Sequence, residues 1–147
     1  EQGVESLRDV TFDMLERYGK EINPVVYRRC KYILEENRRL LEGCNELKTG
    51  NYAAFGQKMF GSHDGLSKDY EVSCAELDFI VDIARNTNGI LGARMMGGGF
   101  GGCVIHIMDE RVHDGYIADV QERFNRQFGI VPRIIDVVIG DGARRLE

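Results

Sequence analysis

Residues 90–108 read ILGARMMGGGFGGCVIHIM, and this stretch decides the fold. Its two outer parts, residues 90–96 and 103–108, are short runs rich in apolar and β-branched residues, as is typical of strands. Six residues join them, and five of the six are glycine. We expect two neighbouring antiparallel strands of one sheet, with the glycine-rich loop at one end.

Helical spacing dominates the chain before this stretch. Apolar residues recur three or four positions apart, and Pro24 suits the first turn of a helix because its missing N–H group is not needed there. Ser6 and Ser73 each begin a pattern that resembles a capping box. The helices that we expect run from Leu7 to Arg17, from Pro24 to Gly50, from Asn51 to Met59 or beyond, and from Ser73 to Asn86.

The segment after residue 108 predicts one more helix and one more strand. Residues 114–128 are amphipathic and precede Gly129, which is typical of a helix end, and Ile134–Ile139 has the pattern of a last strand. The second half thus reads αββαβ, the ferredoxin-like βαββαβ arrangement without its first strand. We predict an α+β fold in which a helical segment is followed by an αββαβ antiparallel sheet with helices on one face.

Composition and charge exclude several classes of protein. A chain of 147 residues with 43% hydrophobic and 29% charged residues is typical of a single soluble domain. We expect it to cover residues 1–147, with a helical part over about 6–70 and a sheet part over about 71–143. The net charge of −5 argues against a nucleic-acid partner. No apolar run approaches the ~20 residues of a membrane span, so no membrane partner is expected.

The four cysteines are scattered, without a CxxC pair or a clustered histidine. This pattern argues against a zinc site and against a disulfide scaffold. It favours reduced thiols and a cytoplasmic location.

The glycine-rich loop is the strongest candidate for a binding site. Glycines make no side-chain contacts and lose more conformational entropy on folding than other residues. So many of them are expected where backbone N–H groups must approach a ligand closely. Phosphate is the usual ligand of such loops. The alternative is a flexible hairpin connection, although two-residue turns already join strands well. The candidate binding residues are Gly97, Gly98, Gly99, Phe100, Gly101 and Gly102.

Two common nucleotide-binding motifs do not fit the loop. Gly97, Gly99 and Gly102 satisfy the GxGxxG pattern of dinucleotide-binding folds, but there the glycines must lead into a helix. Residues 103–108 predict a strand instead. A Walker A sequence, GxxxxGK[ST], is missing from the chain.

Two longer motifs resemble one family. Gly92–Cys103 closely resembles the third conserved motif of galactokinases, which belong to the galactokinase, homoserine, mevalonate and phosphomevalonate (GHMP) kinase superfamily. Ser62–Leu66 and Asp69–Asp78 are similar to a galactokinase signature that lies just upstream. Ser6–Val10 and Asp141–Ala143 also resemble galactokinases, so the resemblance extends over essentially the whole chain.

The chain departs from the family pattern at a few positions. Met96 stands where the family usually has threonine, Ala75 where it has proline, and Ser67-Lys68 where it has an Arg-Asp pair. No glycine is lost. A methionine at position 96 offers no hydroxyl to a phosphate, so the backbone remains as the donor.

The resemblance implies an activity and a division of labour. Galactokinases transfer the γ-phosphoryl group of ATP to galactose with Mg²⁺, and their sugar-binding segment and catalytic aspartate lie in the N-terminal half. The resemblance therefore implies that ATP and Mg²⁺ are bound mainly by an N-terminal domain of the same chain, while this half contributes the loop. It implies that the isolated fragment is inactive.

Two other functions remain open. One is a galactose-binding and ATP-binding transcriptional sensor related to galactokinases, and the other is a GHMP kinase for another sugar.

Among single residues, Arg94 is expected to pair with a carboxylate more readily than with phosphate. We expect structural roles for His63 and for His106, the latter as a partly buried residue on the same face as Val104 and Met108.

Overall fold

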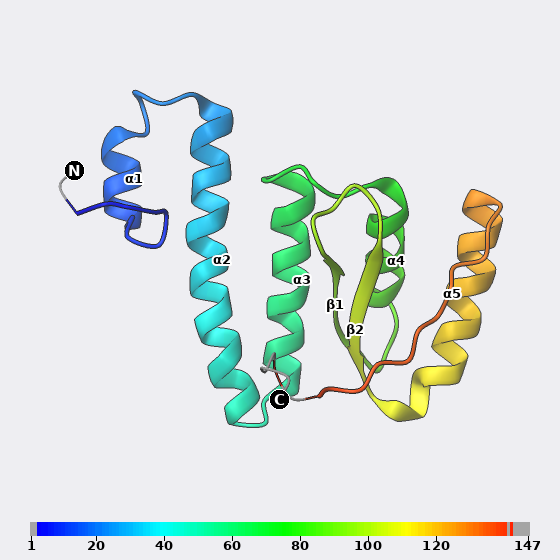
Figure 1. Cartoon of the computed structure of the whole chain (residues 1–147). Coiled ribbons are helices and arrows are strands. Elements are labelled where there is room, and N and C mark those ends of the chain that lie inside the picture. Colours follow the sequence, from blue (N-terminus) through cyan, green and yellow to red (C-terminus); the bar gives the residue numbers. More distant parts are fainter. Residues whose placement is uncertain (1–2, 141, 143–147) are drawn as a thin grey trace, which may run out of the picture.

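The computed structural model describes residues 3–140 and 142. Asp141 and Ala143 of the expected closing motif lie outside the described residues. The helices and strands follow one another in the order α1 (Phe12–Tyr18), α2 (Pro24–Lys48), α3 (Tyr52–Lys68), α4 (Ala75–Arg85), β1 (Ile90–Met96), β2 (Cys103–Met108), the short 3-10 helix η1 (Glu110–Val112) and α5 (His113–Phe128) (Figure 1).

The strands β1 and β2 form an antiparallel hairpin, as the sequence predicts. Met96 pairs with Cys103 at the loop end, and Ile90 pairs with Met108 at the other end. The register shifts between Ile90 and Gly92, where a bulge inserts one extra residue into β1. Residues 97–102 connect the two strands at the loop end.

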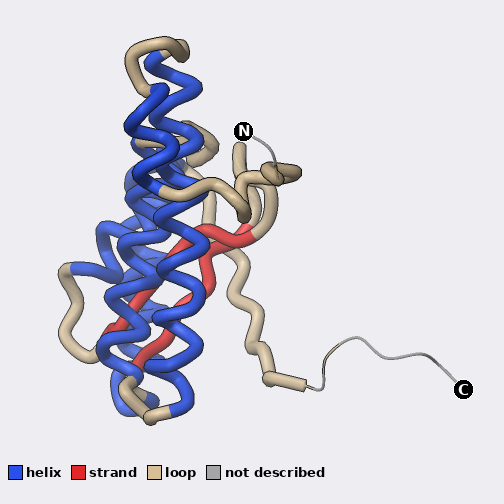
Figure 2. The backbone as a smooth tube through the Cα atoms, turned by 90° about the vertical axis from the view of Figure 1, so that its left-hand side faces the viewer, coloured by secondary structure: helices blue, strands red, loops and turns tan. Residues whose placement is uncertain are grey.

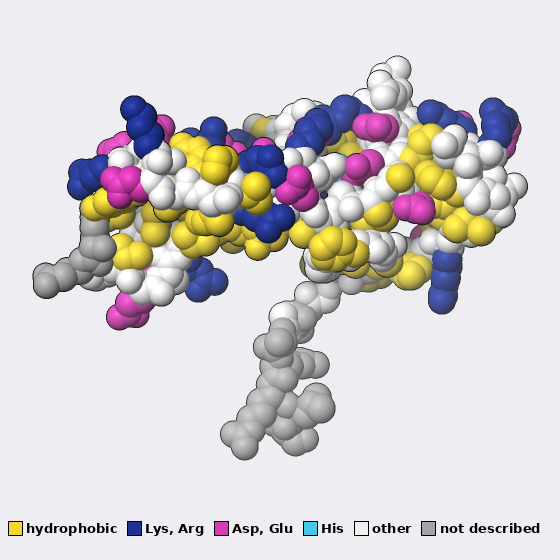
Figure 3. Space-filling model, turned by 90° about the horizontal axis from the view of Figure 1, so that it is seen from above, with side chains coloured by type: hydrophobic (Ala, Val, Ile, Leu, Met, Phe, Trp, Pro, Cys, Tyr) yellow, Lys and Arg dark blue, Asp and Glu magenta, His cyan; other side chains and the backbone are white. Residues whose placement is uncertain are grey.

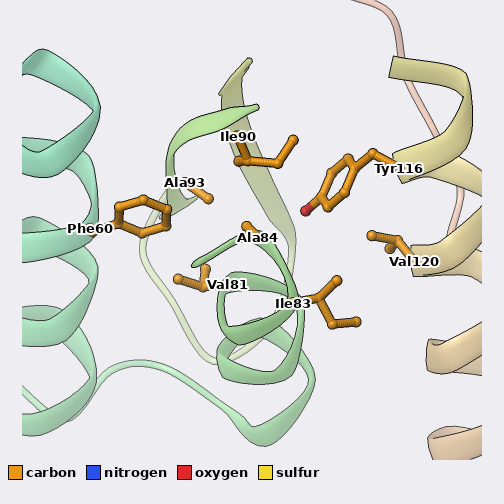
Figure 4. Close-up of a cluster of buried hydrophobic side chains, with 8 residues drawn as sticks. All are labelled: Phe60, Val81, Ile83, Ala84, Ile90, Ala93, Tyr116 and Val120. Atoms are coloured by element: carbon orange, nitrogen blue, oxygen red, sulfur yellow. The ribbon is translucent and has the colours of Figure 1, made fainter. Parts of the chain in front are cut away.

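One face of the hairpin is covered by α4 and α5 and holds the core. Ala93 is fully buried against Val81 and Ala84 of α4, and Tyr116 of α5 packs into the same cluster (Figure 4). Val104 and Met108 lie against this cluster from β2. The expected α+β class, with helices packed on a face of the sheet, is confirmed.

The earlier helices stand beside the sheet. Met95 donates its backbone N–H to His63 of α3 at 3.2 Å, and Gly56 of α3 approaches the backbone of Gly92. The helix α3 therefore runs along the outer edge of β1, and α2 and α1 follow outward in turn (Figures 1 and 2). Because β1 pairs with β2 on its other side, α3 covers an edge that would otherwise be free.

Two of the predicted helix starts are wrong. The first helix begins at Phe12 and not at Leu7, because Asp9 accepts the Ser6 N–H at 2.9 Å within a separate turn and Thr11 caps the helix instead. In α4 the N-cap is Cys74, with no side-chain cap bond. The hydroxyl of Ser73 donates to Asp78 at 2.6 Å and so does not cap the helix.

The predicted last strand is not formed. Ile134–Ile139 runs as an extended loop from the end of α5 past the hairpin, and the sheet of the described residues has two strands (Figures 1 and 2). The apolar and β-branched pattern that predicted the strand is real, but a strand needs a partner with which to share hydrogen bonds. Among the described residues this segment has no such neighbour, and its side chains are largely exposed, with Val138 at 95% and Ile139 at 99%.

Among the described residues, no helix is long and apolar enough to cross a membrane.

The stability of this fold is expected to fall between about pH 6.5 and pH 4 because of His106. Burial lowers the pKa of this side chain to about 4, whereas a histidine in an unfolded chain titrates near 6.5. Within this window the unfolded state binds more protons, so stability is complete above about pH 6.5 and decreases as the pH falls, by roughly 3 kcal/mol at pH 4. Denaturant unfolding of the parent and of His106→Phe across this range checks the prediction, since the variant should show a flatter curve. Equal slopes for both proteins would contradict it.

Candidate functional site

The loop of residues 97–102 has a backbone that few residue types can adopt. Positive φ angles occur at Gly97 (89°), Gly99 (90°), Gly101 (130°) and Gly102 (105°). Phe100 also has a positive φ of 61°. Residues other than glycine rarely adopt such angles, so the conformation of the loop explains four of its five glycines, all except Gly98.

The loop exposes backbone donors. Within the described chain, the N–H groups of Gly98, Gly99 and Gly101 donate to no carbonyl and to no side chain. Over residues 97–99 the sign of φ alternates, and successive N–H groups in such a backbone form a concave site that suits an anion. The loop thus presents backbone donors at the surface.

Positive and negative side chains are mixed on the face of the molecule that is seen from above in Figure 3. At the end of the molecule that is uppermost in Figure 1, Lys and Arg side chains alternate with Asp and Glu (Figure 3). Two surface hollows of about 260 and 200 Å³ lie elsewhere, and neither is lined by a residue of the loop. The loop therefore presents an open surface and not an enclosed pocket.

The tip of the loop is held to the segment that precedes α4. Phe100 donates its N–H to the carbonyl oxygen of Val72 at 2.7 Å. A Cβ atom added to Gly99 would lie 2.9 Å from Cβ of Val72 and closer still to the Val72 carbonyl oxygen. Gly99 is therefore required for this packing, whether or not a ligand binds.

The backbone of the loop tip is hydrogen-bonded, while its aromatic side chain is exposed. The side chain of Phe100 is 77% exposed, although its backbone is fixed. A large apolar side chain in this position is available to a ligand or to another part of a larger protein.

Arg94 does not point its charge into the loop. Its guanidinium donates to Oε1 of Glu36 in α2 at 3.3 Å and to the carbonyl of Met95 at 3.1 Å. Oε1 of Glu36 also accepts from Ser62 of α3 at 2.5 Å. The predicted pairing of Arg94 with a carboxylate is confirmed, and it fastens β1 to α2 and α3.

His63 is a structural residue, as predicted. It is 3% exposed, its Nδ1 accepts the Met95 N–H at 3.2 Å, and its Nε2 lies 3.0 Å from Oδ1 of Asp78. Because Nδ1 accepts a hydrogen bond, the proton of the neutral ring is on Nε2, which donates to Asp78. Burial lowers the pKa of His63, an effect that the nearby Asp78 opposes.

His106 is also structural. It is half-buried on the covered face of the hairpin, and its ring contacts Tyr116 edge-on at 5.4 Å between centroids. Nε2 of His106 has no hydrogen-bond partner among the described residues. Nothing in this arrangement places it near the loop.

Sequence reasoning missed the residues that hold the loop. Val72, Ser73 and Asp78 belong to the second motif, yet no role follows from their residue types alone. The only hint in the sequence that they act on the loop was their position in a long motif close to the loop motif.

The described residues contain no group of three or more Asp, Glu, His or Cys side chains that is able to hold a metal ion.

Comparison with known proteins gives a consistent picture. Residues 40–129 match the family model described as "GHMP kinases C terminal". The chain is 39% identical over 144 residues to a galactokinase of Thermotoga petrophila, with 98% of this chain and 40% of the relative covered. It is 34% identical over 146 residues to a galactokinase of Clostridium beijerinckii, with 99% and 38% covered.

The fold gives the same result. The chain superposes with a TM-score of 0.82 and 29% identity on the crystal structure of the Lactococcus lactis galactokinase, solved in complex with galactose. This match covers 87% of the chain and 33% of that protein. The chain spans about 40% of the length of the curated Thermotoga petrophila relative. The family model covers well over half of the chain, which therefore belongs to the GHMP kinase family and carries its C-terminal domain in residues 40–129.

Proposed function

We propose that this chain is the C-terminal part of a galactokinase, which phosphorylates galactose to galactose 1-phosphate with ATP. In this proposal the residues Gly97–Gly102 form one wall of the site for the nucleotide phosphates. The observation that carries it is the backbone of the loop, where positive φ angles leave the N–H groups of Gly98, Gly99 and Gly101 unpaired at the surface. The galactokinase relatives support the choice of reaction and of sugar.

The loop would act by electrostatic stabilisation. Phosphoryl transfer depends on positioning and on donors that stabilise the charge of the phosphate oxygens. Fixed N–H groups supply such donors without reorganisation during the reaction. The nearby Arg94 is engaged with Glu36, so the backbone carries this task.

Other parts of the complete protein would supply the remaining chemistry. A kinase of this kind uses Mg²⁺ to neutralise phosphate charge, but the described residues offer no cluster of ligands for a metal ion. We assign Mg²⁺, the sugar and the catalytic groups to the preceding domain. That domain would also cover apolar side chains left open here, such as Phe100 and Ile105, which is 37% exposed on the face opposite to α4 and α5.

Gly98→Ala tests the proposed role of the loop. Gly98 is the one loop residue without a positive φ, and a Cβ atom there would meet no atom within 4 Å. The fold should therefore accept alanine, whereas a phosphate in contact with this backbone should not. In the complete protein we expect the KM for ATP to rise by about tenfold, since small misplacements strongly reduce reactivity, while the melting temperature stays unchanged.

The matched control is Gly115→Ala. Gly115 in α5 also has no atom within 4 Å of an added Cβ, but it lies away from the loop. This variant should keep the parent's kinetics. If Gly98→Ala kept them as well, the loop would be a hairpin connection only, and the proposal would be wrong.

The isolated chain is expected to be inactive. Half of a phosphate site leaves most of the triphosphate in water, so ATP should bind more weakly than about 1 mM. Calorimetric titration with ATP and a coupled assay for ADP check this prediction. Galactose-dependent release of ADP by residues 1–147 alone would contradict it.

A further inference from the structure

A single carboxylate gathers the hydrogen bonds next to the loop. Asp78, in the first turn of α4, accepts from Ser73 at 2.6 Å and from His63 at 3.0 Å through Oδ1, and from Ser67 at 2.9 Å through Oδ2. Two donors from α3 and one from the segment that precedes α4 thus converge on one side chain. The position of Asp78 near a helix N-terminus also favours its negative charge.

One of these bonds leads to the tip of the loop. Ser73 is bonded to Asp78, and the neighbouring Val72 accepts the Phe100 N–H at 2.7 Å. The Val72 N–H in turn donates to Leu66 of α3 at 2.9 Å. The segment 72–73 is therefore fixed from both sides, and it is the part of the protein that the loop tip touches.

A second bond leads to the strand that enters the loop. His63 donates to Asp78 through Nε2 and accepts the Met95 N–H through Nδ1. Met95 lies two residues before Gly97. The entry and the tip of the loop are thus tied to the same carboxylate by two separate chains of hydrogen bonds.

The loop has little else to hold it in place. An added Cβ at Gly97, Gly98 or Gly101 would meet no atom within 4 Å, so these residues are not packed against the protein. The connection through Phe100 and Val72 is the one backbone bond from the loop to the rest of the described chain beyond the two strands. The orientation of the unpaired N–H groups of the loop must therefore depend on the bond between Phe100 and Val72 and on the position of β1.

We propose that Asp78 is a positioning residue for the loop 97–102, acting through Ser73 and Val72 on its tip and through His63 and Met95 on its entry. This inference rests on the proposed function, because the loop must bind phosphate for its position to matter. Asp78 itself does not touch the nucleotide. Its effect is to keep the free N–H groups aimed at the phosphates.

The test uses the complete protein with Ser73→Ala, Ser73→Thr and Asp78→Asn. Ser73→Ala breaks the path to the tip but leaves the buried His63 contacts intact. We expect kcat/KM for ATP to fall by about tenfold, because phosphoryl transfer depends on alignment, while the KM for galactose changes by less than about twofold. Ser73→Thr keeps the hydroxyl and should restore the parent's values. Asp78→Asn should have a larger effect because it disturbs both paths.

The matched control for Asp78→Asn is Asp64→Asn. Asp64 lies next to His63 in the sequence, but it pairs with Lys68 at 3.1 Å and with Arg85 at 3.0 Å and has no bond to the segment 72–73. The kinetics of this variant should match those of the parent. Melting temperatures of all variants separate loss of folded protein from loss of alignment, and Ser73→Ala keeps the test valid if Asp78→Asn does not fold.

The outcomes distinguish this inference from the proposed function. If Gly98→Ala weakens ATP kinetics and Ser73→Ala does not, the loop binds phosphate but Asp78 does not position it. If neither variant affects ATP kinetics, the proposed function fails and this inference with it. A loss in Ser73→Ala that threonine does not restore, or that is equal for ATP and galactose, would also overturn it.

Discussion

Alanine in place of Gly56 is expected to destabilise the protein by about 4 kcal/mol, which is above the usual range for overpacking. An added Cβ would lie 2.9 Å from the backbone nitrogen of Gly92 and closer still to the carbonyl of Leu91. These are backbone atoms of a strand that is paired with β2. They cannot move aside as the end of a flexible side chain could. The Gly92 position is equally tight, since its own Cβ would lie 2.8 Å from the carbonyl carbon of Gly56.

Gly61→Ala is the matched control in the same helix. The nearest atom to an added Cβ at Gly61 is Nε of Arg39 at 3.5 Å, which is an ordinary contact. Alanine is a better helix former than glycine by roughly 1 kcal/mol, so this variant should be neutral or slightly stabilising. Denaturant unfolding of both variants measures the difference. Similar stabilities for Gly56→Ala and Gly61→Ala would contradict the close approach of α3 to β1.

The close approach of α3 to β1 could not be predicted from the sequence. Helical spacing placed residues 51–59 in a helix, and the alternating pattern placed residues 90–96 in a strand, but neither pattern says which elements meet. Glycines inside a helix at positions 56, 61 and 65 were a signal, because each weakens the helix and so suggests a packing reason. Of the three, only Gly56 meets strand backbone, and that distinction needs coordinates.

Local patterns succeeded where the stabilising partner is close in sequence. The hairpin 90–108 was predicted because both strands and their connection lie within one short stretch. The last strand, Ile134–Ile139, failed for the opposite reason. Its apolar pattern shows that the segment is suited to a sheet. A strand forms only where a second strand pairs with it, and the pattern does not say whether one is present.

The site could be predicted in part for similar reasons. Five glycines in six residues identify the loop, and four of the five have positive φ angles, which favour glycine. The residues that hold it are less visible, since Val72 acts through its carbonyl oxygen and any residue type has one. Ser73 was interpreted as a helix cap because the local capping pattern competes with its actual bond to Asp78.

Gly97→Ser in the complete protein is expected to reduce kcat/KM for ATP by about a hundredfold, since misplacement of a phosphate contact by about 1 Å has effects of this size. Gly97 has a φ of 89°, and an added Cβ would meet no protein atom within 4 Å. Serine therefore meets no other part of the described chain. It disfavours the backbone conformation by about 1 kcal/mol and brings a side chain to the surface where we place the phosphates.

Gly129→Ser separates these two effects. Gly129 ends α5 with a φ of 73°, and an added Cβ there also meets no atom within 4 Å. Serine at either position should therefore lower the melting temperature by a similar few degrees. Only Gly97→Ser should lose turnover, because only that residue belongs to the loop. The measurements are kcat, the KM for ATP and the melting temperature of both variants beside the parent. Equal kinetics for the two variants would mean that the strained backbone at residue 97 serves the hairpin alone and that the nucleotide phosphates lie elsewhere.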